Sequence, residues 1–178
     1  MRALALSALL LSAALAPLPA PAATPARAGI TLVDQTGARF ALTDMKGRPT
    51  VVTFIATRCT DTCPISDALF SKLSRENLPA RLLTVTLDPA YDTPFVMARH
   101  ARDLNARPDR WRVASGSPRD IGRLLAAFGV VREYHGNGVP DAHSSFIYVF
   151  DAAGRLTKTL PLSTNSLAEV RAAVTHAS

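Results

Sequence analysis

Long apolar stretches are scarce in this sequence of 178 residues. The most extended one, from Ala3 to Ala16, has about 14 residues, fewer than the roughly 20 that a helix needs to span a membrane. Arg2 precedes it and small residues follow it at Ala20 and Ala22, which is the pattern of a secretory signal peptide. We therefore expect an exported chain with no stable membrane span after cleavage.

The domain prediction follows from the rest of the composition. We assign residues 1–22 to the signal peptide and residues 23–28, which are rich in Ala and Pro, to a flexible lead. Residues 29–178 contain no repeat, low-complexity stretch or long linker, and they suffice for one domain. Export predicts a periplasmic or otherwise exported protein; the alternative is a chain tethered to the membrane by an uncleaved N-terminal segment.

Basic clusters and aromatic residues are also scarce. Aromatic residues make up 6% of the chain, and the net charge of +6 comes from arginines dispersed among acidic and apolar residues, as between Arg99 and Arg132. A nucleic-acid groove needs clustered basic residues with exposed aromatics, so no nucleic-acid partner is expected. The positive charge better suits an acidic partner surface.

Apolar β-branched runs alternate with helical patterns, which is typical of an α/β sheet. The pattern predicts a hairpin over 30–42, strands over 50–56, 81–87 and 111–114, helices over 64–77, 94–104 and 118–128, a hairpin over 146–160 and a last helix from Ser166, with Ser166 and Glu169 as a capping box. This order predicts a thioredoxin-like fold with an N-terminal β-hairpin and an additional C-terminal hairpin and helix.

The helix that begins at Pro64 is expected to bury one apolar face. Proline is favoured at the first helical position, and Ile65, Ala68, Leu69 and Leu73 follow at helical spacing. These four side chains are therefore predicted to pack on the sheet.

Cysteine is rare: the chain has only Cys59 and Cys63. They follow the end of a predicted central strand, where open α/β sheets bind ligands. Cys63 directly precedes the helix, whose N-terminal N–H groups and dipole are expected to lower the pKa of its thiol. Redox thioredoxins keep two residues between their cysteines. Three residues separate them here, so both sulfurs can point at a common third object.

Two thiolates suit copper(I), and an added imidazole would complete a trigonal site that also holds copper(II). Of the four histidines, His143 is the best candidate, because it directly precedes the strand over 145–150 in a loop expected to run beside the cysteines. His135 begins that loop and is predicted to face solvent, with an alternate-ligand role left open. His100 is expected on a surface or boundary, and His176 in the tail.

Several motifs, taken in their order along the chain, resemble those of a known family. They are C-x-x-x-C-P from Cys59, Leu87-Asp88-Pro89, Asp92-Thr93-Pro94, Trp111-Arg112, Ala127-Phe128-Gly129-Val130 and His143-Ser144. In order and spacing, residues 29 to 175 resemble the Sco/SenC family. The resemblance implies a thioredoxin fold and one copper ion per monomer, held by Cys59, Cys63 and His143. It also implies that the partner is a cytochrome c oxidase subunit, whose binuclear copper site receives copper or has its thiols maintained.

Two departures from the family pattern affect what can be transferred. The family usually has Asp directly before the ligand histidine, whereas this chain has Ala142 there and Asp141 one place earlier. The carboxylate that orients the imidazole is thereby shifted or lost, and this change is expected to alter copper affinity. The aromatic-Thr pair that usually leads into the first cysteine is replaced by Ala56-Thr57-Arg58. Arg58 is expected to stabilise thiolate and to favour redox work.

Other polar and soft side chains have simpler interpretations. Asp92 is expected to serve turn and helix-cap chemistry, and Asp61 to be solvated. Asp88 is expected near the site, as a supporting or partner-contact residue. Met97 and Trp111 are interpreted as core.

Three alternatives to a copper chaperone follow from the same residues. The first is an enzyme, a periplasmic thiol-disulfide oxidoreductase that uses the Cys59/Cys63 pair, and one protein can have both roles. The second, a peroxiredoxin-like peroxidase, needs Thr and Pro where this chain has Ala56 and Val52, so it is disfavoured. The third, a purely structural disulfide, leaves the position of His143 unexplained.

Overall fold

The computed structural model describes residues 29–134, 138–143 and 145–177, without the side chains of residues 141–143. The predicted signal peptide and lead, together with His135, therefore lie outside the described residues. The elements are β1 (Leu32–Asp34), β2 (Arg39–Phe40), η2 (Leu42–Met45), β3 (Thr50–Ile55), α1 (Cys63–Arg75), β4 (Arg81–Thr86), α2 (Pro94–Asp103), β5 (Trp111–Gly116), α3 (Pro118–Phe128), β6 (Arg132–Tyr134), β7 (Pro140–His143), β8 (Phe146–Phe150), β9 (Leu156–Pro161) and α4 (Ser166–Ala177).

Seven strands form one sheet in the order β2-β1-β5-β4-β3-β8-β9. β3, β4 and β5 run parallel at its centre, and β1 and β8 pair antiparallel on either side. Every residue of β3 is buried, as expected for a central strand covered on both faces. At one edge β2 has only two residues, and at the other edge β9 is mostly exposed.

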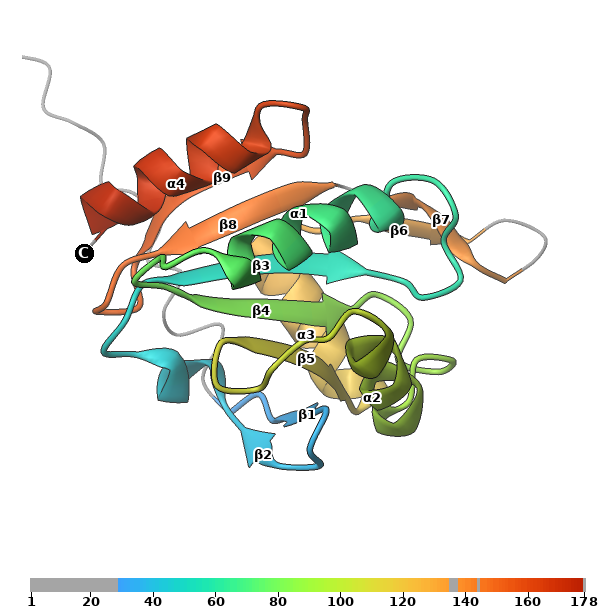
Figure 1. Ribbon diagram of the computed structural model, residues 1–178. Helices are drawn as coiled ribbons and strands as arrows, with labels where there is room; N and C mark the ends of the chain where they lie inside the picture. Colours follow the sequence, from blue (N-terminus) through green and yellow to red (C-terminus); the bar gives the residue numbers. More distant parts are fainter. Residues whose placement is uncertain (1–28, 135–137, 144, 178) are drawn as a thin grey trace, which may run out of the picture.

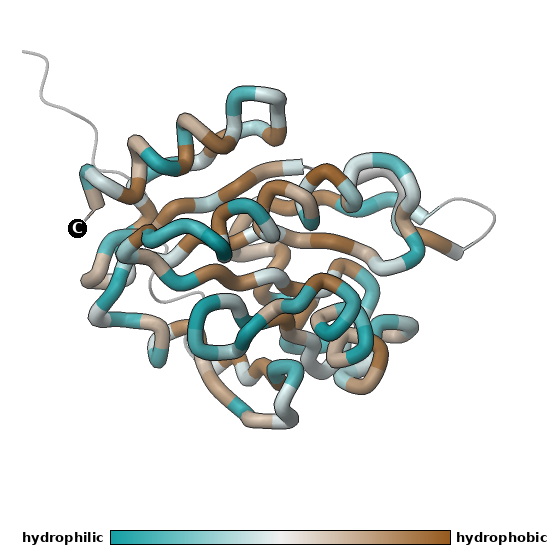
Figure 2. Tube along the Cα trace, viewed as in Figure 1, coloured by the Kyte–Doolittle hydropathy of each residue, from teal (hydrophilic) through white to brown (hydrophobic). Residues whose placement is uncertain are grey.

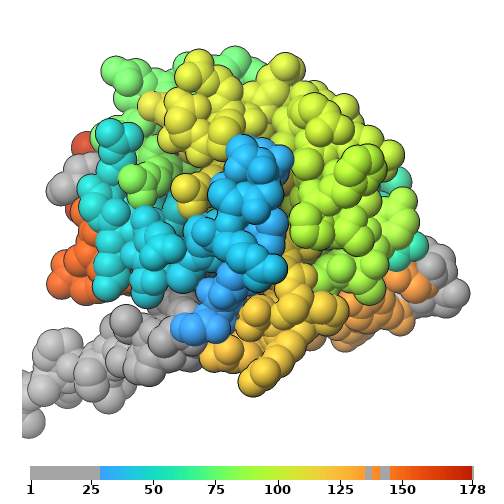
Figure 3. Space-filling model, turned by 90° about the horizontal axis from the view of Figure 1, so that it is seen from below, coloured from blue at the N-terminus to red at the C-terminus, as the bar shows by residue number. Residues whose placement is uncertain are grey.

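Helices cover both faces of the sheet (Figure 1). α1, α2 and α4 lie on one face and α3 crosses the other, while the β1–β2 hairpin closes the lower edge (Figure 3). The predicted thioredoxin-like α/β fold, with its N-terminal hairpin and added C-terminal hairpin and helix, is confirmed.

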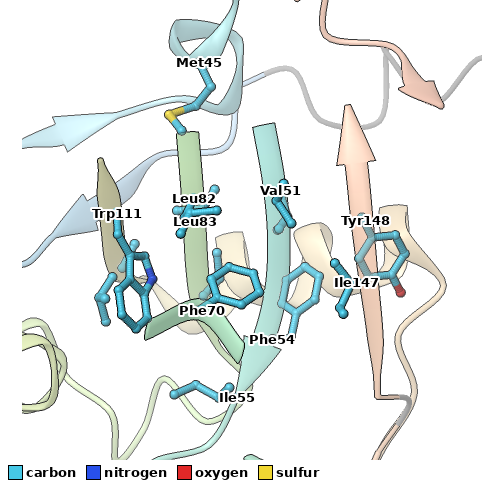
Figure 4. Packing of buried hydrophobic residues seen from close by; sticks show 14 of the residues in the cluster. Met45, Val51, Phe54, Ile55, Phe70, Leu82, Leu83, Trp111, Ile147 and Tyr148 are labelled. Carbon is cyan, nitrogen blue, oxygen red and sulfur yellow. The ribbon is translucent and has the colours of Figure 1, made fainter. Parts of the chain in front are cut away.

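The core lies between the parallel strands and their helices. Brown, apolar segments follow the central strands in Figure 2. Trp111 and Phe70 are fully buried and their ring centroids lie 5.9 Å apart, packed over β4 (Figure 4). The Trp111 indole also donates to Thr84 Oγ1 at 3.0 Å, and Met97 is fully buried. The core interpretation of Trp111 and Met97 is confirmed.

Two local predictions are corrected by the structure. In α1, Leu69 and Leu73 are buried as predicted. The buried face of α1 consists of Cys63, Ser66, Leu69, Phe70 and Leu73, whereas Ile65 is 53% exposed and Ala68 is exposed. The helix begins one residue earlier than expected, and its rotation is set by Cys63 and Phe70, which face the sheet.

The predicted capping box of the last helix is also wrong. Ser166 is the first helical residue, and its Oγ accepts from Ser163 N at 2.8 Å and donates to Pro161 O. The N–H of Glu169 instead bonds to Asn165 O. The hydroxyl of Ser166 therefore ties the β9–α4 turn together.

The segment between α3 and β8 also holds structure that the sequence analysis assigned to a loop. β6 and β7 pair antiparallel as a separate two-stranded sheet, with Arg132 opposite His143. No helix among the described residues is long and apolar enough to cross a membrane.

Candidate metal centre

Both cysteines lie where β3 ends and α1 begins, at the carboxyl edge of the parallel strands (Figure 1). Cys59 is 7% and Cys63 2% exposed. The N–H of Cys59 donates to Ala56 O at 3.0 Å, and the N–H of Ala56 donates to the sulfur of Cys63 at 3.3 Å. The end of the strand thus positions both thiols in one turn, residues 57–63, which we call the cysteine turn.

Burial determines the protonation of Cys63. Loss of solvent raises the pKa of its thiol well above the ordinary value; the Ala56 N–H opposes this shift, and the neighbouring Cys59 adds to it. The expected lowering of this pKa by the helix N-terminus is therefore wrong for the reduced, metal-free protein. In the reduced, metal-free protein, burial therefore favours the protonated form of the Cys63 thiol.

Asp92 holds Thr57, the first residue of the cysteine turn. Its carboxylate is fully buried and accepts from the N–H of Thr57 at 3.1 Å, from the Thr57 hydroxyl and from Thr86 Oγ1 at 2.8 Å. The helix cap belongs to Thr93, whose hydroxyl accepts from Val96 N. The cap interpretation of Asp92 is corrected: it joins the ends of β3 and β4.

Arg58 connects three segments around the site. Its Nη2 donates to Asp88 Oδ2 at 2.8 Å and to Gly138 O at 3.0 Å, and its guanidinium lies 4.1 Å from the centre of the Tyr91 ring. Asp88, which is 3% exposed, raises the pKa of Arg58 through this hydrogen bond. The charge of Arg58 is thus paired with the carboxylate of Asp88, whose supporting or partner-contact role stays a prediction.

The arrangement of Arg58 also bears on the thiols. Burial is the largest cause of the raised pKa of Cys63; the Ala56 N–H opposes it, and Cys59 and Asp67 add to it. Arg58 is paired with Asp88, and its expected stabilisation of thiolate stays a prediction. Asp61 is exposed, as predicted.

The chain that follows His143 contacts the residue directly before Cys63. His143 ends β7, and two residues later the Ser145 hydroxyl lies 3.3 Å from the hydroxyl of Thr62, which directly precedes Cys63. Two residues of chain span at most about 7 Å. The imidazole itself lies outside the described side chains, so its role as a ligand stays a prediction.

His100 and His176 lie in α2 and α4, and His135 lies outside the described residues. His100 in α2 is at a boundary, with its Nε2 3.1 Å from Asp67 Oδ2 of α1. Burial lowers the pKa of His100 and Asp67 more than compensates, so the net shift is upward. His176 lies in the last turn of α4. Among the described side chains, no group of three His, Cys, Asp or Glu could hold a metal ion.

The Asp92 and Arg58 contacts were missed by sequence reasoning. The motif Asp92-Thr93-Pro94 marks a turn, and nothing in its spacing shows which distant backbone its carboxylate will meet. The sequence signalled the Arg58 contact only because Arg58 departs from the family pattern, and that departure suggested a different role for Arg58.

Comparison with known proteins places this geometry in a family. Residues 21–177 match the sequence model of the SCO1/SenC family. A SCO2-like protein of Rickettsia felis is 28% identical over 137 residues, which cover 71% of this chain and 65% of that protein, slightly under two thirds of its length.

Solved structures agree on the fold. ScoI of Bradyrhizobium japonicum with copper bound superposes with a TM-score of 0.71 at 24% identity, over 84% of this chain and 97% of that one. BsSco, a member of the Sco family of cytochrome c oxidase assembly proteins in which a disulfide switch was identified, gives 0.69 at 25% identity over 83% and 90%. Because the family match runs through nearly the whole described fold, from before β1 to the end of α4, this chain belongs to the SCO1/SenC family.

Proposed function

We propose that this protein is an exported copper chaperone. It binds one copper ion per monomer through Cys59, Cys63 and His143 and delivers it to the binuclear copper site of cytochrome c oxidase. The observation that carries the proposal is the contact between Ser145 and Thr62, because it supports bringing the backbone of His143 to the cysteine turn. Membership of a family that includes copper-bound proteins supports the choice of metal.

The chemistry of the donors fits this cargo. Two cysteine sulfurs and one imidazole are soft and borderline ligands, the set that copper(I) accepts in trigonal geometry and that copper(II) also tolerates. Burial of both sulfurs shields a bound ion from water, and the Ala56 N–H provides a hydrogen bond to thiolate sulfur once copper displaces the Cys63 proton. Copper uptake should therefore release protons.

A thiol-disulfide role is the second candidate. The two cysteines share one turn, and BsSco carries a disulfide switch. In this role a thiolate of Cys59 or Cys63 attacks the client's disulfide, and the other cysteine resolves the mixed disulfide. The client's cysteines leave reduced, and Cys59 and Cys63 become the oxidised pair. Trapping a mixed disulfide with a single-cysteine variant would distinguish this activity from metal transfer.

The three-ligand site is tested by metal analysis of the reduced protein. The parent is expected to retain about one copper per chain in the presence of a competing chelator. His143→Ala is expected to weaken copper(II) binding at least tenfold, and Cys63→Ser to abolish it, because the thiolate is the stronger ligand. His176→Ala, which removes an imidazole far along the chain in α4, is the matched control. Equal copper retention by His143→Ala and the parent would refute the site.

The partner proposal rests on where apolar side chains are exposed. Ile65, Tyr91, Phe95, Tyr134 and Phe146 are between 37% and 72% exposed, and their segments begin or end at the carboxyl edge of β3 and β4. Leu156, 41% exposed, pairs with Phe150 at the opposite end. Grouped exposed apolar residues mark interaction sites. The basic charge of the chain favours an acidic partner, so we assign this rim to the copper-accepting oxidase subunit.

Substituting the most exposed residue of the rim tests this assignment. Phe95→Ser is expected to slow copper transfer to the isolated copper-binding domain of the oxidase subunit by about tenfold, since a buried Phe contributes at least the 1.4 kcal/mol that a factor of ten requires. Leu156→Ser should transfer at the parent rate, and both variants should hold as much copper as the parent. Parent-like transfer by Phe95→Ser would remove the rim from the interface.

A further inference from the structure

The cysteines and the histidine are carried by parts of the fold that are held differently. The cysteine turn joins a central strand to α1, and Asp92, in the connection between β4 and α2, accepts hydrogen bonds from its first residue, Thr57. His143 lies in the β6–β7 hairpin, which among the described residues is a two-stranded sheet apart from the seven-stranded one. A lone two-stranded hairpin is marginally stable in water, so the position of His143 depends on contacts between the hairpin and the body.

Two guanidinium groups make such contacts. Arg132, opposite His143 in the hairpin, donates from Nη1 to Leu87 O at the end of β4. Arg58, directly before Cys59, donates to Gly138 O at 3.0 Å in the connection between the two strands. One arginine thus belongs to the hairpin and reaches the body, and the other belongs to the cysteine turn and reaches the hairpin.

The Arg58 side chain is itself held in place. Asp88 accepts from the same Nη2 at 2.8 Å, and the ring of Tyr91 lies 4.1 Å from the guanidinium carbon. Asp88 is in turn fixed by its N–H, which donates to the hydroxyl of Thr86 at 2.8 Å. A planar guanidinium held by a carboxylate on one side and an aromatic face on another loses little further freedom when it bonds a carbonyl.

We propose that Arg58 is a positioning residue that holds the β6–β7 hairpin, and with it His143, against the cysteine turn. The inference rests on the proposed function, since it deepens the copper site rather than adding another. Asp88 orients Arg58 and balances its charge, so the positive group beside the cysteine turn does not repel a bound cation.

Amide hydrogen exchange on the reduced, metal-free protein tests the positioning role without copper. In Arg58→Met, which keeps an apolar stem and removes the guanidinium, the amides of residues 138, 139 and 141–143 are expected to exchange about tenfold faster, while those of β3 and α1 stay unchanged. Arg107→Met removes an arginine paired with Asp109 on the surface and is the matched control. Unchanged exchange over 138–143 in Arg58→Met overturns the proposal, whether or not the protein binds copper.

A double-mutant cycle then asks whether Arg58 acts through His143. Arg58→Met is expected to weaken copper(II) binding about tenfold in the parent, the range seen for residues that orient a ligand, and to have no further effect in the His143→Ala background. An equal loss in both backgrounds would show that Arg58 acts on the cysteines instead and would overturn the proposal. A parent that fails to hold copper would refute the proposed function and leave the exchange experiment to decide the role of Arg58.

Discussion

Replacement of Asp92 by alanine is expected to lower stability more than any other single change near the site. The carboxylate is fully buried, and its loss leaves the N–H and hydroxyl of Thr57 and the hydroxyl of Thr86 without their acceptor. Stranded buried donors cost about 1–3 kcal/mol each, and because Thr57 is only half-buried its two donors should fall at the low end, so the total should reach about 3–5 kcal/mol. For a domain of this size that corresponds to a fall of about 10 °C in the melting midpoint.

Thermal unfolding of the reduced protein, followed by circular dichroism, measures this effect. Asp92→Asn keeps one acceptor oxygen and should melt between the parent and Asp92→Ala. Asp109→Ala removes an exposed carboxylate paired with Arg107 and should melt like the parent. If Asp92→Ala and Asp109→Ala melt together, the buried carboxylate does not hold the cysteine turn as described.

Alkylation of Cys63 is expected to accelerate continuously as the pH rises. Burial raises the pKa of this thiol above its ordinary value, so only a small thiolate fraction is present at neutral pH. Well below the pKa, the reaction rate grows about tenfold per pH unit, and no plateau should appear by about pH 9.5, whereas an ordinary cysteine levels off near its pKa of about 8.5. The measurement uses iodoacetamide on the reduced Cys59→Ser variant.

The same shift has a consequence for stability. Because the folded state keeps a proton that the unfolded state releases above about pH 8.5, the metal-free, reduced protein should lose stability as the pH rises past that value.

For the alkylation experiment, the control is the same Cys59→Ser variant unfolded in denaturant, in which Cys63 is an ordinary thiol. A rate for the folded variant that levels off below pH 8 would contradict the burial effect.

The sequence predicts most of the architecture for identifiable reasons. Runs such as Thr50–Ile55 are apolar throughout because helices cover both faces of β3, and the Pro-initiated helices begin within a residue of the predicted positions. Gly129 ends α3 in the left-handed region, with φ of 65°, where glycine is unstrained. These features depend on local patterns, which a sequence displays directly.

The errors concern contacts between residues distant in sequence. The thiol pKa of Cys63 was misjudged because helix position is visible in a sequence and burial is not. Likewise Asp92 meets Thr57, 35 positions away, and Arg58 meets Gly138, 80 positions away. Ile65 was assigned to the core on helical spacing alone, although Cys63 and Phe70 set the rotation of α1. Which distant residue a polar side chain contacts depends on how the strands are ordered in the sheet. A single sequence does not display that order directly.

The two outer strands of the sheet have a bearing on the behaviour of the protein at high concentration. β2 offers only two residues of ladder, and β9 presents charged Lys158 along a mostly solvated strand that ends at Pro161. Short, charged or proline-terminated borders are poor templates for adding a foreign strand, so edge-to-edge growth into aggregates is discouraged at both ends of the sheet. Self-association through β-augmentation should accordingly be negligible.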